Sequence, residues 1–319
     1  MSDTFFTASP EWTWWIILYF FVGGIAGTAF FLASLLHLTD RSPAGRQSPS
    51  RPIIRLGYYT AFIGSIISGF LLTVDLNRPL RFWHMLIESN TGQPMFKSWV
   101  PMSVGSWGLL LFSLFAFLAA LAALGEERPN VRLLQSAPIR LLRRRAPSIA
   151  IAVLGSIFGL FLAGYTGVLL AVTNRPIWAD STLLGLLFLV SGASTGAAAL
   201  ILLAIWRRTG QPASIDWLAW FDRRVLILEL VVLAVFLVSL GPVARVFLGW
   251  WGAALLLGVV GIGILVPLLL ERRDRVSAPR DLVRSASLVL LGGLLLRVVV
   301  LLSSAEIHVL GSGVTGVSP

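Results

Sequence analysis

The segment from Asp75 to Trp107 holds most of the side chains in this sequence that could take part in chemistry. It begins D-L-N-R-P-L-R-F-W-H and, after a loop that contains glycine and proline, ends S-W-V-P-M-S-V-G-S-W. A carboxylate such as Asp75 can accept and release protons, and aromatic rings can enclose the flat ring of a ligand. Arg78 and Arg81 can hold an anionic group. The segment is therefore a candidate site for proton exchange with a bound ring and for contact with a partner.

The composition indicates an integral membrane protein. The chain has 319 residues, of which 56% are hydrophobic and 13% are charged, and its mean hydropathy is +0.85. Such values, together with long uncharged runs, are typical of membrane proteins. The formal charge of +10 does not indicate a nucleic-acid partner, because the arginines fall between the apolar runs, where they set topology and contact lipid head groups. The absence of cysteine excludes thiolate-bound iron–sulfur clusters and cysteine-bound zinc within this protein.

Eight apolar runs are each long enough to cross a bilayer, which takes about 20 helical residues. Lipid offers the backbone no hydrogen-bond partners, so these runs must be helices. We predict an all-α integral membrane protein with eight transmembrane helices arranged as two four-helix bundles, residues 1–174 and 175–319. The predicted spans are residues 12–38, 53–75, 99–124, 147–173, 182–206, 224–243, 248–270 and 285–305.

Basic residues are divided unevenly between the two sets of connections. The odd-numbered connections, with the span ends beside them, hold 19 basic residues, whereas the even-numbered connections hold five. Lys and Arg are enriched in cytoplasmic loops, so we predict that the odd connections are cytoplasmic and that both termini lie on the outer, periplasmic side.

The first and fifth spans contain similar runs of small residues, G-G-I-A-G-T-A and S-G-A-S-T-G-A. Both spans run from outside to inside, so the two halves could be a parallel repeat. Small-residue runs also recur in any closely packed membrane helix, and the sequence leaves both interpretations open.

Polar and aromatic residues of the first four spans fall at a similar depth near the outer surface. A rise of about 1.5 Å per residue places Tyr19 and Tyr165 about 10 Å below that surface, and Ser106 and Trp107 within about 12 Å of it. Asp75 closes the second span at the surface. Polar groups are costly in lipid and by default face a bundle interior or a cavity, so we expect these residues to share a site. Taken singly, the aromatic residues also fit interfacial belts or ordinary packing.

The outer loop adds three candidates for docking a partner, Arg81, His84 and Lys97. The alternative for Arg78 and Arg81 is contact with lipid phosphates, and His84 is as consistent with an ordinary surface residue as with a ligand. Neither haem nor a metal site is expected. Haem is disfavoured because a bis-histidine haem needs two histidines that face each other within a bundle, whereas His37 lies near the cytoplasmic side and His84 and His308 lie outside.

Two charged residues lie deeper in the second half. Glu229 is about 8 Å into the sixth span from the cytoplasmic side, and Arg297 is about 18 Å into the eighth. Charges at such depths are expensive and rarely idle, so we predict that both belong to a polar path for protons. The alternatives are snorkelling of Glu229 to the interface and a structural bond from Arg297 to carbonyls or to a carboxylate. Because their depths differ by about 10 Å, we expect no direct contact without helix tilt or water.

The chain resembles the NrfD/PsrC family, the polysulfide-reductase-type membrane subunits. D-L-N-R-P-L-R-F looks like the family's D-L-G-R-P-x-R-F motif, with Asn77 replacing the usual glycine. The match covers the first five spans well, and several ordered motifs together are more specific than any one of them. The segments that carry the resemblance are Tyr19–Ala29, Asp75–Phe82, Met102–Trp107, Tyr165–Asn174 and Leu189–Gly196.

This resemblance implies an eight-helix subunit, without haem, metal or iron–sulfur cluster, that binds an exchangeable menaquinone or ubiquinone near the outer side. An iron–sulfur (ferredoxin-like) subunit docks there, and a molybdenum or tungsten catalytic subunit often lies beyond it. By motif position, Asp75 and Arg78 belong to the quinone-site loop, and Tyr19 and Tyr165 line the pocket. Glycine reaches backbone angles that asparagine adopts only at a cost, so Asn77 puts the loop shape in question.

We therefore expect a quinone-binding anchor subunit of a respiratory oxidoreductase in a bacterial or archaeal cytoplasmic membrane. It would exchange electrons between the quinone pool and the iron–sulfur partner, with proton translocation through the second half. The expected quinone-site residues are Asp75, which exchanges protons, and Tyr19, Ser106, Trp107, Tyr165 and Arg78, which bind the ring.

The alternative function is a secondary transporter of an ion or small solute. Eight spans, the repeat and the buried Glu229 and Arg297 would suit transport. Transporters more often carry charges near the midplane in both halves, whereas the polar cluster here lies toward one face. That asymmetry favours the quinone interpretation.

The topology can be tested with reporter fusions placed after Gln47, Gln135, Gln211 and Ser277. The division of basic residues predicts that all four fusions report a cytoplasmic location. Paired alkaline phosphatase and fluorescent-protein fusions provide the measurement, and periplasmic signals at two of the sites would overturn the eight-span topology.

Overall fold

The computed structural model describes residue 12 and residues 14–40, 49–76, 78–173, 175–270 and 279–312, with the side chains of the last range described for 280–304. This part of the protein is all-helical, apart from an isolated bridge between Ile87 and Pro94. Its elements, in order, are α1 (Trp14–Thr39), α2 (Arg51–Asp75), η1 (Pro79–Met85), α3 (Pro101–Glu127), η2 (Arg132–Gln135), α4 (Ala137–Leu142), α5 (Arg145–Ala171), α6 (Leu184–Trp206), α7 (Pro212–Ser239), η3 (Gly241–Leu248), α8 (Trp250–Ala253), the π-helical η4 (Ala254–Leu265), α9 (Val266–Leu270) and α10 (Pro279–Ser312).

Seven of the predicted spans appear as helices that are long and apolar enough to cross a membrane, with α8, η4 and α9 counted as one rod. The predicted sixth span, residues 224–243, differs most from the structure. Its helix, α7, begins at Pro212, where proline suits the first turn, and includes a charged turn that the apolar run did not reveal. Gly241 has φ +53° and precedes a proline, and the backbone bends by 111° between α7 and η3. Only this bent pair could supply an eighth span in the described residues, so the count of eight stays a prediction.

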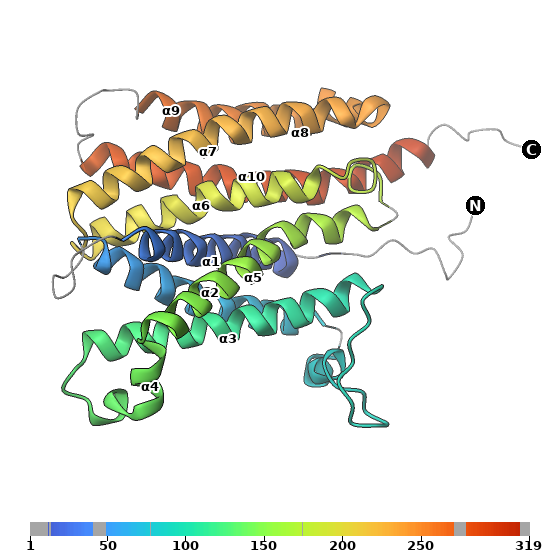
Figure 1. The fold of residues 1–319 in the computed structure, drawn as a ribbon. Helices are drawn as coiled ribbons and strands as arrows, with labels where there is room; N and C mark the ends of the chain where they lie inside the picture. Colours follow the sequence, from blue (N-terminus) through green and yellow to red (C-terminus); the bar gives the residue numbers. More distant parts are fainter. Residues whose placement is uncertain are drawn as a thin grey trace, which may run out of the picture.

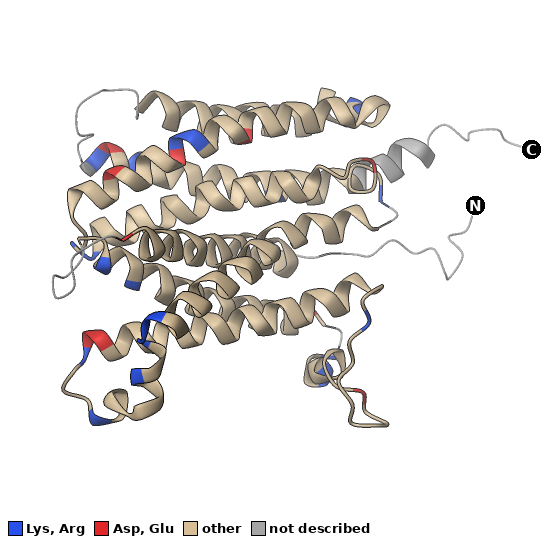
Figure 2. Ribbon diagram, viewed as in Figure 1, with Lys and Arg blue, Asp and Glu red and all other residues tan. Residues whose placement is uncertain are grey.

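The long helices run up and down between two ends of the molecule (Figure 1). At one end α1 begins, α2 ends and α10 ends; we call it the η1 end, because η1 projects there. At the other end α1 ends, α2 begins and α4 lies, and Figure 2 shows most lysine and arginine residues gathered there. We call this the basic end. The charge asymmetry found in the sequence is therefore an asymmetry between the two ends of the bundle.

α1 lies at the centre of the bundle and packs against α2, α5, α6 and α10. Its packing depends on close backbone approach, because a Cβ at Gly27 would overlap the carbonyl oxygen of Gly159 on α5. On another side, Thr28 donates a 2.6 Å hydrogen bond to the carbonyl oxygen of Gly192 on α6. The small-residue runs of the first and fifth spans are thus packed against each other. This contact joins the predicted halves, whose boundary at residues 174 and 175 stays a prediction.

We expect Gly27→Ala to destabilise the protein by about 1–3 kcal/mol, because the added methyl group would overlap the α5 backbone and force the helices apart. Gly69→Ala on α2 is the matched control, since a Cβ there has no neighbour within 4 Å. Thermal unfolding of the purified variants in detergent provides the measurement. Equal midpoints for both variants would show that the α1–α5 approach is not as tight as described.

Candidate functional site

A pocket of about 240 Å³ lies at the η1 end, between the last turns of α2, the first half of α3 and the helix η1. Phe82, Met85 and Leu86 form one wall, and the rest is mostly aliphatic. Ser106 is the one predicted quinone-binding residue in its lining, and it donates 2.8 Å to the Met102 carbonyl oxygen. We call this cavity the η1 pocket. Its size is near the lower end of small-molecule sites, and its apolar wall with a few hydroxyl groups suits a flat, largely apolar ligand.

The two predicted tyrosines lie inside the bundle rather than in the lining of the η1 pocket. Tyr19 on α1 is 2% exposed, and within the described residues its hydroxyl has no hydrogen-bond partner. Tyr165 on α5 donates a 2.5 Å hydrogen bond to the Pro101 carbonyl oxygen, and its ring lies directly on Gly105. A Cβ at position 105 would overlap this ring, so glycine there is required by the contact. Tyr165 therefore ties the start of α3 to α5 and keeps acceptor capacity on its oxygen.

Sequence reasoning missed a third polar group in this region, Ser68 on α2. The residue is fully buried, and its hydroxyl has no hydrogen-bond partner in the described part of the protein. A Cβ built at Gly23 would lie 3.5 Å from Ser68 Oγ and 3.7 Å from the Tyr19 ring, so both side chains border the same glycine. A buried hydroxyl without a partner is costly, and one beside a tyrosine marks a place where a ligand oxygen or a water molecule can bind. The only sign of this role for Ser68 is its position beside a glycine of α1, and that position is known only from the fold.

The predicted catalytic residue, Asp75, is the last residue of α2 and is half-buried. Arg78 directly precedes η1, makes no side-chain capping bond there and is exposed, and Asn77 lies outside the described residues. Trp107 is half-buried, and its ring nitrogen donates 3.0 Å to the Met95 carbonyl oxygen. This bond anchors the outer loop to α3. The structure therefore gathers the predicted residues at one end of the bundle but divides them between the η1 pocket, the bundle interior and the loop.

The outer loop presents an exposed surface that mixes aromatic and basic residues. Leu80 is 89% exposed and Trp99 78% exposed, and Arg81 on η1 is exposed as well. His84 stacks on Trp83 with ring centroids 3.8 Å apart, and its Nδ1 lies 3.1 Å from the Arg81 carbonyl oxygen. We call this the η1 surface; it comprises Arg78, Leu80, Arg81, Phe82, Trp83, His84, Phe96, Lys97 and Trp99. Arginine and aromatic residues of this kind are enriched at protein–protein contacts.

Glu229 and Arg297 are both buried and are linked through two serines of α6. Ser194 donates a 2.9 Å hydrogen bond to Glu229 Oε2, and Arg297 donates 3.2 Å to Ser191 Oγ, one turn away. Arg297 also donates to the carbonyl oxygens of Phe20 and Gly293. The expectation that the two charges do not touch directly agrees with this geometry.

We call Glu229, Ser194, Ser191 and Arg297 the serine network. Its two serines lie in the L-V-S-G-A-S-T-G segment of α6. Nothing in that segment alone indicates that they face Glu229, because the contact depends on how α6 and α7 are rotated against each other.

The described residues contain no group of three or more His, Cys, Asp or Glu that could hold a metal ion. At the η1 end, the polar side chains that line the apolar pocket are Thr73, Ser106 and Ser113, whereas Asp75, Arg78 and Arg81 lie outside its lining. These three hydroxyls donate to carbonyl oxygens of their own helices, and the apolar wall suits a flat, largely apolar ring.

Comparison with known proteins gives a match to the family described as "Polysulphide reductase, NrfD" over residues 4–307. This match covers nearly the whole sequence, including nearly all of every long helix.

Individual relatives agree with the family match. A protein of Wolinella succinogenes that is named as one of the chains of polysulfide reductase is 28% identical, and the match covers 89% of each protein. Protein NrfD of Escherichia coli is 28% identical, and the match covers 94% of this protein and 96% of that one. A protein of Mesobacillus selenatarsenatis that is named as one of the subunits of selenate reductase is 26% identical over a shorter stretch, 37% of this protein and 24% of that one.

Proposed function

Because the chain belongs to the polysulphide reductase NrfD family and is a multi-pass membrane protein, we propose that it is the quinone-reactive membrane subunit of a reductase complex. Two relatives are named as components of polysulfide reductase and of selenate reductase, which supports membership of an assembly with several subunits. The exchangeable substrate is menaquinone or ubiquinone from the lipid phase. Each turnover exchanges two electrons between the quinone and a cofactor in a partner subunit, and two protons between the quinone and water.

One observation carries the proposal: η1 forms both a wall of an apolar pocket and part of an exposed surface. Phe82 lines the η1 pocket, while Arg81 and Trp83, on either side of it, belong to the η1 surface. A quinone ring bound in or beside this pocket would lie one short helix away from a partner docked outside. Because the sequence has no cysteine to hold a cluster, electrons must pass to a cofactor in that partner, which we propose is a ferredoxin-like iron–sulfur subunit beneath a molybdenum or tungsten catalytic subunit.

In this proposal, some residues at the η1 end bind the substrate and another exchanges its protons. Tyr19 and Ser68 offer buried hydroxyls to a ring oxygen, and Tyr165 fixes the start of α3, which carries Ser106 in the pocket wall. Asp75, half-buried at the end of α2, takes a proton from the substrate or returns one to it, and passes it to the adjacent water.

The serine network supports proton movement through the second half. Glu229 is the titratable member, and the hydroxyls of Ser194 and Ser191 lie along α6 between Glu229 and Arg297. Asp222 lies two turns earlier on the same face of α7, nearer the basic end, and is fully buried. With the basic end in the cytoplasm, as the positive-inside rule indicates, protons would enter near Asp222 and move toward the η1 end. The same network would equally suit an ion transporter, but the pocket beside the η1 surface favours the quinone function.

Asp75→Asn tests the proton-exchanging group. The substitution keeps the shape and removes the base, so quinone-coupled turnover should fall by at least about 100-fold while the complex assembles. Electron flow from the catalytic subunit to the iron–sulfur clusters, followed with an artificial donor, should persist. Glu88→Gln, an exposed carboxyl of the same loop, is the control and should retain full turnover. Wild-type quinone activity in Asp75→Asn would remove Asp75 from the mechanism.

Arg81→Glu tests the docking surface. Reversing a charge on η1 should weaken subunit association. A partner that fits the basic, aromatic η1 surface would meet a negative charge in place of a positive one. Co-purification of the iron–sulfur subunit measures this effect. Arg245→Glu, an exposed charge reversal on η3 at the same end, should leave co-purification unchanged. Loss in both variants would indicate a diffuse charge effect instead of docking on η1.

Glu229→Gln tests the proton path. The amide keeps a hydrogen bond with Ser194 but carries no titratable proton, so turnover under a proton gradient should slow while quinone affinity stays unchanged. Asp216→Asn, exposed on the same helix, is the control. Unchanged turnover and unchanged proton-to-electron stoichiometry in Glu229→Gln would make the residue structural. Turnover and quinone titrations in proteoliposomes provide the measurement.

A further inference from the structure

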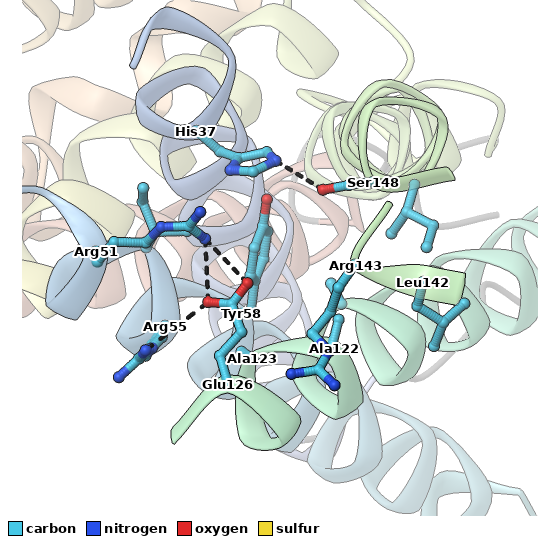
Figure 3. Close-up of a pocket in the computed structure, with 13 residues that line it drawn as sticks. His37, Arg51, Arg55, Tyr58, Ala122, Ala123, Glu126, Leu142, Arg143 and Ser148 are labelled. Atoms are coloured by element: carbon cyan, nitrogen blue, oxygen red, sulfur yellow. Dashed lines mark hydrogen bonds and ion pairs between the residues drawn. The ribbon is translucent and has the colours of Figure 1, made fainter. Parts of the chain in front are cut away.

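A second cavity, lined by several charged and polar side chains, lies at the basic end, at the opposite end of α2 and α3 from the η1 pocket. It encloses about 30 Å³ and is lined from α1, α2, α3, α5 and the segment around the end of α4. Figure 3 shows Arg51 and Arg55 of α2 on one side, with Arg143 opposite and His37 above. The proposed function gives this cavity no role, because the quinone residues are at the other end.

The positive charges around this cavity are only partly compensated. Arg51 donates to both carboxylate oxygens of Glu126, at 3.2 and 3.1 Å, and Arg55 pairs with the same carboxylate at 3.8 Å. Two guanidinium groups thus share one carboxylate. The Nε of Arg55 is buried and has no hydrogen-bond partner within the described residues. A buried donor without a partner favours an additional acceptor at this place.

Arg143 adds a third guanidinium that has no carboxylate partner in the described residues. It donates 3.0 Å to the Gly125 carbonyl oxygen and 2.8 Å to the side-chain oxygen of Gln135, both neutral acceptors. The lining therefore sets three arginines against one carboxylate. Arginine is the side chain that best matches the oxygens of a phosphate group.

Two helix N-termini reinforce the positive potential. α2 begins at Arg51 and α5 at Arg145, both at this cavity, and in neither helix does the residue before it cap the first turn with its side chain. Ser148, in the first turn of α5, lines the cavity and bonds His37 at 2.7 Å. Uncapped N–H groups and the helix dipole both attract anions.

We propose that this cavity binds the phosphate group of an anionic phospholipid from the leaflet at the basic end. The enclosed space is about that of one water molecule, so one phosphate oxygen reaches inside and the remainder is held at the mouth by the arginines. A lipid is favoured over a free anion because the face of α2 that carries Arg55 also carries an exposed apolar side chain farther along the helix. Ile66, on the same face of α2 as Arg55 and about 16 Å along the helix, is 55% exposed, as is Ile63. The acyl tail of a lipid can lie along this face.

The test uses the purified full-length protein in a neutral detergent, with thermal unfolding followed as phosphatidylglycerol is added. Phosphatidylglycerol should raise the unfolding midpoint of the wild type, and phosphatidylcholine should not. Arg55→Gln and Arg143→Gln should each need about tenfold more phosphatidylglycerol for half the effect, as expected for loss of one charged hydrogen bond. Arg140→Gln, exposed on α4, removes the same charge outside the cavity and should respond as the wild type does.

Native mass spectrometry of the same samples supplies a second measurement that does not depend on unfolding. The wild type and Arg140→Gln should retain one phosphatidylglycerol more than Arg55→Gln. Equal retention and equal midpoints in all variants would overturn the proposal in favour of general charge attraction. Protection by inorganic phosphate at the same concentration would overturn the lipid assignment in favour of a soluble anion. Neither measurement involves quinone turnover, so this proposal and the proposed function can fail separately.

Discussion

The close approach of other helices to α1 is the constraint on which the arrangement depends. Without a hydrophobic driving force between helices in lipid, association relies on packing and interhelical hydrogen bonds, and small residues allow both. Gly27 meets Gly159 of α5 at backbone distance, and Thr28 donates to the Gly192 carbonyl oxygen of α6. α1 therefore fixes α5, whose Tyr165 bonds the start of α3 at the η1 end, on one side, and α6, which carries Ser191 and Ser194, on the other.

Arg297 is held by this same crossing. A Cβ at Gly24 would lie 3.0 Å from a guanidinium nitrogen of Arg297, so a glycine on α1 makes room for a buried charge from α10. The guanidinium donates to the Phe20 carbonyl oxygen of α1 and to Ser191 of α6. It also lies over the ring of Phe188 at 5.3 Å. One side chain thus joins three helices, and its bonds offset part of the cost of burying a charge in the membrane. Arg297, a residue of the proton path proposed for the second half, therefore also holds α1, α6 and α10 together.

The two ends of the bundle differ in chemistry, because lipid excludes polar side chains from the outer sides of the helices and exposed polar groups gather at the ends. At the η1 end, apolar pocket walls, hydroxyls and an exposed aromatic surface suit exchange with a substrate and contact with a partner. At the basic end, arginines and helix N-termini suit anionic head groups. Asp75 and the Arg51–Glu126 pair sit at opposite ends of α2, so a single helix spans the two environments.

The sequence by itself determined the class of the protein, the positions of seven membrane-crossing helices, the asymmetry of basic residues and the family, because hydropathy, arginine placement and ordered motifs are properties of the linear sequence. It also located Asp75, Tyr19 and Tyr165 near one end, since depth follows from helical rise. It missed the early start of α7 at Pro212, because charged helical turns outside the apolar region carry no hydropathy signal.

Only the tertiary structure decided which side chains meet. The link from Glu229 to Arg297 through the serines of α6, the unpartnered Ser68 beside Tyr19, and the bond from Tyr165 to Pro101 depend on how helices are rotated and how closely they approach. Rotation is set by packing around α1, and packing is a relation between distant segments that no single span contains.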